Sequence, residues 1–206
     1  MQLLRLLFRI YYGSRIRFFS IIGTLFFKVI LKAFGAKFGR NLKCDGFPIV
    51  RLKPDSNVII GDNFRVHSSE DFNIIGRFHR TGIVTGHNAS LIIRDNVGIS
   101  ASTIVCYKKI EIGNNVMIGG NCVIYDTDFH SIDNKMRRDP ATNIAANFTK
   151  PVSIGDEVFI GAHSTILKGT VIGRGAVIGA GSVVTGNIPE FELWAGNPAK
   201  YIKKIP

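Results

Sequence analysis

The sequence predicts an all-β solenoid behind a helical leader. Three observations carry this prediction: a six-residue repeat, one long interruption of it, and an uneven distribution of charge. In the last third of the chain, aliphatic residues recur every six positions without a slip: Ile154, Ile160, Ile166, Ile172, Ile178 and Val184. A period of six fits neither a helix of 3.6 residues per turn nor a single strand of period two. It fits short strands joined by corners around a coil.

The same period occurs earlier in the chain. Ile112, Ile118 and Ile124 are six residues apart, and so are Ile93, Ile99 and Val105. The step from Val105 to Ile112 is seven residues, which indicates one inserted residue at that corner. In an ordinary β-sandwich the spacing between the buried aliphatic residues of successive strands would vary, because hairpin loops vary in length. We therefore expect a β-helix domain over residues 44–188, in which the aliphatic residues face the axis.

Two segments fall outside the repeat. The pattern disappears between Ile124 and Ile154, which predicts a loop, residues 125–151, that protrudes from the coil. Pro189 ends the repeat and begins a tail over residues 189–206. Within this tail we expect Ala199–Ile205 to form a short helix that caps the coil.

The leader carries most of the net positive charge. The net charge is +11, yet residues 1–43 hold nine Lys or Arg and no Asp or Glu. The longest uncharged run, Phe18–Phe27, is ten residues, about half of what a membrane-spanning helix needs. We expect an amphipathic leader of two helices broken near Gly13–Ser14. Residues 1–34 would lie on an anionic membrane surface, or alternatively pack against the solenoid or a second subunit.

Other partner and cofactor classes have weaker support. No nucleic-acid recognition motif accompanies the basic residues, so we expect no nucleic-acid partner. The three cysteines, Cys44, Cys106 and Cys122, have neither a metal-binding spacing nor an even count. We expect no metal site and a reducing, cytoplasmic location, which would be peripheral on the inner face of the cell membrane if the leader binds lipid.

Three segments together resemble a known family: "DTDFHSID" (Asp126–Asp133), the regular repeat of Lys150–Pro189, and "AGNPAK" (Ala195–Lys200). They are similar to the hexapeptide-repeat acyltransferases with a left-handed parallel β-helix, and most of all to the sugar and polysaccharide O-acetyltransferases. The resemblance covers about residues 58–205 and leaves out the leader. It implies the hand of the coil, a homotrimer, acetyl-CoA as co-substrate and a saccharide acceptor.

His130 is the candidate general base. An imidazole with a pKa near 6.5 accepts a proton at neutral pH, and a neighbouring carboxylate can orient it. Asp126 and Asp128 both stand close in sequence, and the choice between them stays open. The resemblance places the family's catalytic histidine at His130. Without it, a solvated loop histidine and turn-forming aspartates would explain the same residues.

The resemblance also implies contacts with acetyl-CoA. They are made by small residues of the coil and by lysines of the tail: Ala162, Ala180, Thr185, Gly186, Lys200 and Lys203. Many relatives place Lys where Gly186 stands, so this chain lacks that lysine side chain as a phosphate contact. Lysine is a suitable point-charge partner for phosphate at the other two positions. Hexad packing and a solvated tail are the alternative explanation.

The acceptor site is the least defined. Ser100 and Ser102 lie roughly where relatives contact the sugar, and Arg137 in the loop could reach a sugar or a phosphate. The predicted function is acetyl-CoA-dependent O-acetylation of a sugar hydroxyl in surface polysaccharide or glycolipid synthesis. Two alternatives are N-acetylation of a nucleotide-linked amino sugar and a non-catalytic β-helix scaffold.

Overall fold

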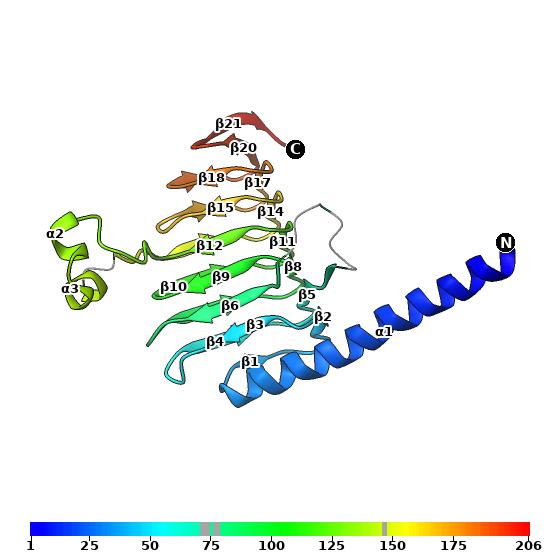
Figure 1. Ribbon diagram of the computed structural model, residues 1–206. Helices are drawn as coiled ribbons and strands as arrows, with labels where there is room; N and C mark the ends of the chain where they lie inside the picture. Colours follow the sequence, from blue (N-terminus) through cyan, green and yellow to red (C-terminus); the bar gives the residue numbers. More distant parts are fainter. Residues whose placement is uncertain (71–74, 76–78, 146–147) are drawn as a thin grey trace.

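A computed structural model describes the whole chain except residues 71–74, 76–78 and 146–147. The strands follow one another in rotation through three sheets, and every pair inside the coil is parallel (Figure 1). Sheet A contains β1 (Lys37–Phe38), β4 (Asn57–Ile60), β7 (Ser90–Ile93), β10 (Lys109–Ile112), β13 (Val152–Ile154), β16 (Val171–Ile172) and β19 (Asn187–Ile188). Sheet B contains β2 (Lys43–Gly46), β5 (Arg65–Ser68), β8 (Gly98–Ser100), β11 (Met117–Ile118), β14 (Phe159–Ile160), β17 (Val177–Ile178), β20 (Glu192–Gly196) and β21 (Ala199–Lys204). Sheet C contains β3 (Ile49–Arg51), β6 (Gly82–Thr85), β9 (Thr103–Cys106), β12 (Val123–Tyr125), β15 (Thr165–Ile166) and β18 (Val183–Val184).

The six-residue repeat forms the core of this parallel β-helix. The six aliphatic residues spaced six apart from Ile154 to Val184 are at most 2% exposed, which confirms that they face the axis. Residues eighteen apart are register partners, as in Ile154 with Ile172 and Ile160 with Ile178, so one coil contains three hexads. Each such side chain contributes roughly 1.5–3 kcal/mol by its burial. The repeat thus builds one continuous core along the axis.

The small residues at the corners have two physical roles. The buried Ser164 hydroxyl donates to the Gly161 carbonyl (2.8 Å), and that of Thr170 donates to the Leu167 carbonyl (2.6 Å). A Cβ on Gly161 would come within 2.6 Å of the backbone nitrogen of Ala180 in the next coil. Gly161 is therefore required by the close stacking of coils.

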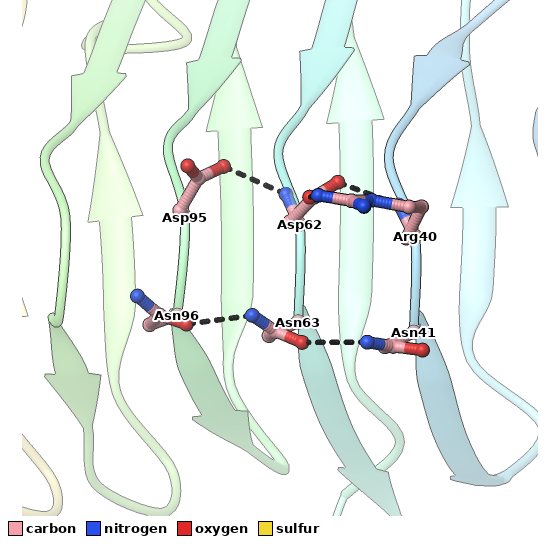
Figure 2. Close-up of polar contacts among 6 residues, drawn as sticks. All are labelled: Arg40, Asn41, Asp62, Asn63, Asp95 and Asn96. Atoms are coloured by element: carbon pink, nitrogen blue, oxygen red, sulfur yellow. Dashed lines mark hydrogen bonds and ion pairs between the residues drawn. The ribbon is translucent and has the colours of Figure 1, made fainter.

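Asparagine supplies the turn conformation at the corner that joins sheet A to sheet B. Asn41, Asn63, Asn96 and Asn115 each adopt a φ between 57° and 60°, a region that Asn tolerates better than most residues. The side-chain amides of the first three each donate to the Oδ1 of the asparagine one coil further along, at 3.1, 2.8 and 3.0 Å. Figure 2 shows the first three members of this asparagine ladder.

Aspartates run beside the asparagine ladder at the same corner. Asp62 Oδ1 accepts the backbone N–H of Arg40 at 2.7 Å, and Asp95 Oδ1 accepts that of Asp62 at 2.7 Å (Figure 2). The Arg40 guanidinium also forms an ion pair with Asp62. The turn amides that the coil cannot pair within its sheets are thus bonded from one coil to the next.

The leader is one helix, α1 (Gln2–Ala33), so the prediction of two helices broken near Gly13–Ser14 is wrong. Phe27 and Leu31 are fully buried on the first coil, and Gly23 lies against the carbonyls of Gly46 and Cys44. The first twelve residues are all exposed, and this end of α1 projects past the coil (Figure 1). The coil begins at β1, before the boundary expected at residue 44. None of the described helices is long and apolar enough to cross a bilayer.

The tail is a β-hairpin, and the expected helix over Ala199–Ile205 is wrong. β20 continues sheet B in parallel with β17, and β21 pairs antiparallel with β20. The last coil leaves an open strand edge, and an added strand satisfies its backbone groups. Trp194 is the register partner of Ile178 and packs against the core, so the hairpin closes this end of the coil.

Candidate active site

The excursion, residues 126–151, leaves the coil after β12 and returns to it at β13 (Figure 1). Its two ends form a neck, in which the Lys150 N–H donates to the Asp126 carbonyl (3.0 Å) and Thr127 bridges to Thr149. Beyond the neck lie two short helices, α2 (Asn134–Arg137) and α3 (Pro140–Ala145). The neck fixes where the segment that carries His130 begins.

Asp126 is fully buried at the base of the neck. Its carboxylate accepts the backbone N–H groups of Tyr107, Lys108 and Lys109, each at 2.7 Å. These three residues form the corner where the seven-residue step inserts one residue. The carboxylate therefore accepts turn N–H groups that the regular repeat would leave without a partner. Asp126 therefore holds the corner, which corrects the prediction that it orients His130.

Asp128 fastens the neck to the following coil. Its carboxylate pairs with the Lys168 Nζ at 2.8 Å, and the same Nζ lies 4.8 Å from the centre of the Phe148 ring. Among the described residues, no hydrogen bond joins either aspartate to His130. An orienting role for Asp128 stays a prediction; Lys168 engages its Oδ2.

Asn143 of α3 holds the exposed ring of His130. Its Nδ2 lies 2.9 Å from His130 Nδ1, while its Oδ1 accepts the Ser131 N–H at 2.9 Å. The second bond assigns the orientation of the amide, because the oxygen must face the N–H. Nδ1 is then an acceptor, so the neutral ring carries its proton on Nε2. Sequence reasoning missed Asn143, which stands thirteen residues from His130 outside any motif.

The backbone around His130 is set by aromatic packing. Phe129 has a φ of 64°, and its ring packs edge-on against Tyr125 at 5.1 Å and Tyr107 at 6.2 Å. Arg137 donates to the carbonyls of Ser131 (2.8 Å) and Ile132 (2.7 Å). It thus closes the turn that follows His130, and its predicted contact with the acceptor stays untested by this arrangement.

The predicted acetyl-CoA residues fall into three groups. Ala162 and Ala180 stack in successive coils at the corner that joins sheet B to sheet C, and neither N–H donates to a backbone carbonyl of the described residues. Thr185 and Gly186 are exposed at the corner that joins sheet C to sheet A. Lys200 and Lys203 are exposed on β21. These N–H groups and ammonium groups suit a polar, phosphate-bearing arm.

One chain does not bring these groups together with His130. The excursion leaves sheet C at the carboxyl end of β12, whereas Ala162 and Ala180 precede the amino ends of β15 and β18. They therefore lie at opposite ends of the strands of sheet C. Thr185 and Gly186 share the corner of the excursion but stand two coils further along.

The two predicted acceptor serines differ. Ser102 is fully buried, and its hydroxyl donates to the carbonyls of Ser100 and Gly119, both at 2.8 Å, and accepts the Cys122 N–H. It is a corner residue of the coil, which corrects its assignment as a sugar contact. Ser100 is partly exposed at the end of β8, in register with His67.

Comparison with known proteins identifies the family. A family model described as the hexapeptide repeat of succinyl-transferase matches residues 109–126 and 151–186, the coil on either side of the excursion. The putative lipopolysaccharide biosynthesis O-acetyl transferase WbbJ of Escherichia coli is 32% identical over 174 residues, which cover 81% of each chain. The chain belongs to the hexapeptide-repeat acetyltransferase family.

Solved structures of the family show the same fold. A maltose O-acetyltransferase from Clostridium difficile is 29% identical with a TM-score of 0.51, over 87% of this chain and 74% of that one. A mutant of AntD, an N-acyltransferase from Bacillus cereus crystallised with an amino-sugar nucleotide and coenzyme A, is 20% identical with a TM-score of 0.62, over 87% and 89%. At that identity the likeness to AntD shows the fold alone. Against three other curated relatives, this chain spans about half of their length, between 44% and 57%.

Proposed function

We propose that this hexapeptide-repeat protein is an acetyl-CoA-dependent O-acetyltransferase of a sugar hydroxyl, built on a left-handed β-helix, with His130 as general base. The similarity to WbbJ carries the proposal, because a match over 81% of both chains necessarily takes in the excursion. The names of WbbJ and of the maltose O-acetyltransferase support a saccharide acceptor. The acceptor would belong to a surface polysaccharide or glycolipid, and a cytoplasmic location stays a prediction.

The reaction would proceed by direct attack. The acceptor oxygen bonds to the thioester carbonyl carbon, its proton passes to His130, and the carbon–sulfur bond breaks to release the CoA thiolate, which takes up a proton. The backbone N–H of Ala162 donates to no backbone carbonyl of the described residues. It is our candidate for stabilising the negative charge that develops on the thioester oxygen.

The base role needs a change at the His130 ring. Nε2 can accept a proton only in the tautomer that carries hydrogen on Nδ1, and Asn143 presents a donor to Nδ1. In our proposal Nδ1 exchanges Asn143 for a hydrogen-bond acceptor when the complete site forms. Asp128 is the candidate acceptor, since it stands two residues before His130 in the neck.

The separation of the two half-sites supports the predicted homotrimer. His130 and the pair Ala162 and Ala180 lie at opposite ends of sheet C in one chain. A neighbouring coil packed beside the excursion would supply the second half-site without any change in either chain. We therefore propose that each site is shared by two subunits, the excursion of one facing the coil of the next.

The test uses labelled acetyl-CoA with free and lipid-linked saccharides that offer hydroxyl or amine acceptors. We expect transfer to a hydroxyl and a loss of roughly 10²–10⁴-fold in rate for His130→Ala, with CoA affinity nearly unchanged. His87→Ala is the matched control, because His87 is exposed and pairs with Asp55 at the corner between β6 and β7, two coils before the excursion. Full activity of His130→Ala would remove the base assignment. Transfer to amines alone would show that the protein is an N-acetyltransferase. Absence of CoA binding in calorimetry would favour a non-catalytic β-helix scaffold.

A further inference from the structure

The helix α1 carries one apolar stripe along its whole length, on the side away from the coil. Eighteen residues make five full turns of an α-helix, so residues eighteen apart share one azimuth. Three exposed apolar pairs have this spacing and neighbouring azimuths: Leu4 with Ile22, Leu7 with Leu25, and Tyr11 with Val29. Phe18 lies midway on the same line. These seven side chains, the outer stripe, are between 37% and 75% exposed.

The same geometry places the opposite side of α1 on the coil. Gly23 and Phe27 pack against the first coil, and Arg5 and Arg9 stand eighteen residues before them. The polar residues of the projecting end thus continue the face that docks on the solenoid. The outer stripe cannot be covered by the coil of its own chain, because it lies on the opposite side of the helix axis.

The charge of α1 indicates what covers the stripe. The helix contains six Lys or Arg, and the first acidic residue of the chain is Asp45. Lys28 and Lys32 each stand three residues after a stripe position, so they border the stripe. In an interfacial helix, such lysines extend to lipid head groups while the apolar side chains enter the acyl boundary. Anionic lipid satisfies both features of α1 at once.

A second copy of α1 fits the same features less well. Pairing two stripes would bring Lys28 and Lys32 near the corresponding cations of the partner helix, and no residue of α1 is acidic. Like charges at the edges of a helix pair oppose association.

We propose that α1 lies flat on an anionic membrane through its outer stripe and carries the β-helix on its opposite side. The helix would lie in the plane of the interface along its full length, so the projecting end and the docked end both contact lipid. This inference is independent of the proposed acetyl transfer, since it rests on the surface of α1 alone.

Flotation of the full-length protein with vesicles tests the proposal. We expect binding to vesicles of phosphatidylcholine mixed with phosphatidylglycerol, weak binding to phosphatidylcholine alone, and loss of binding as salt is raised. Leu7→Glu should lower the binding roughly tenfold or more, because it places a carboxylate in the stripe. Gln2→Glu is the matched control: it changes the charge equally near the same end but lies on the opposite face.

Both positions are exposed, so neither variant should change the melting temperature or the acetylation of a soluble acceptor. Failure of acetylation in the wild type would count against the proposed function and leave this test intact. Absence of vesicle binding, or an equal effect of the two variants, would overturn the membrane assignment. If Leu7→Glu instead dissociates the oligomer and leaves vesicle binding unchanged, a second copy covers the stripe.

Discussion

The corner between sheets A and B and the corner between sheets C and A pair their polar groups in different ways. At the first, three successive Asn amides each donate to the Asn of the next coil, and Asp62 and Asp95 each accept an N–H of the previous coil (Figure 2). At the second, one buried carboxylate, Asp126, accepts three consecutive N–H groups, and the chain then departs for 26 residues, 126–151. The first corner repeats the same hydrogen bonds from coil to coil, whereas the second uses a single buried carboxylate for the N–H groups of one turn.

This difference indicates where chemistry can be placed on such a coil. Some corner positions accept glycine only, since even a Cβ on Gly161 would strike the next coil. His130 is carried instead by backbone that leaves the coil, and Asp126 anchors the start of that backbone. We therefore expect substitutions at the regular corner to change stability alone, and substitutions at the irregular corner to change stability and activity together.

The largest effect is expected at the anchor. Asp126→Ala should lower the free energy of unfolding by about 3 kcal/mol or more, because three buried N–H groups lose a charged acceptor. The neck should also lose its position, so acetyl transfer should fall by roughly 10²-fold. Urea unfolding and initial rates measure both. Asp126→Asn keeps one acceptor oxygen and should give intermediate values; a wild-type rate for Asp126→Ala would show that the anchor does not position His130.

The next effect is at Asn143, a positioning residue. Asn143→Asp offers an acceptor to both the Ser131 N–H and the His130 Nδ1, which favours the tautomer that the base needs. We expect this variant to keep or raise the rate. Asn143→Ala should lower it roughly tenfold, because the Ser131 N–H beside His130 loses its acceptor and the turn loses its position. The ¹⁵N shifts of the His130 ring report the tautomer, with the proton on Nε2 in the wild type and on Nδ1 in the Asp variant. Equal rate losses in both variants would show that Asn143 only stabilises α3 and does not control the tautomer of His130.

At the regular corner, Asn63→Ala should cost about 1–2 kcal/mol and leave kcat unchanged. It removes two amide hydrogen bonds of the asparagine ladder and places Ala at a φ of 59°. Asn63→Gly tolerates that φ and should cost less, so the difference between the variants isolates the backbone contribution. A change in kcat for either variant would show that the regular corner affects activity as well as stability, which contradicts the expected difference between the two corners.

The smallest effect concerns acid stability at the same corner. The backbone N–H of Arg40, followed by its guanidinium, holds the pKa of Asp62 below its ordinary value. A carboxylate with a lowered folded pKa stabilises the fold above the unfolded value of about 3.9 and loses that contribution as pH falls through the folded value. The melting temperature of the wild type should therefore fall more steeply below pH 4 than that of Asp62→Asn. Parallel curves would show that the exposed pair contributes nothing.

The coil could be predicted because its determinants are local and repeated. Ile154 to Val184 occur at one spacing, and each meets the same requirement at the axis. The two ends of the chain could not be predicted in the same way. α1 continues through Gly13 as one helix, and β21 forms where an open sheet edge accepts a strand; both outcomes depend on neighbours that a short sequence window does not contain.

The candidate site divides along the same line. His130 stands in a recognisable segment, but the neighbours in sequence, Asp126 and Asp128, are engaged by turn amides and by Lys168. The ring partner, Asn143, comes from a helix thirteen residues away. Side chains of the excursion come into contact because of the path of its backbone, and no regular spacing in the sequence relates them.

The sequence by itself determined the coil of six-residue repeats, the point of its interruption and the segregation of net positive charge into the leader, because each follows from the spacing or the count of residue types along the chain. Tertiary structure decided which carboxylate anchors the excursion, which nitrogen of His130 carries the proton, and which side of α1 stays uncovered. These depend on which backbone N–H groups and side chains lie within hydrogen-bonding or packing distance, and only the folded path sets those distances.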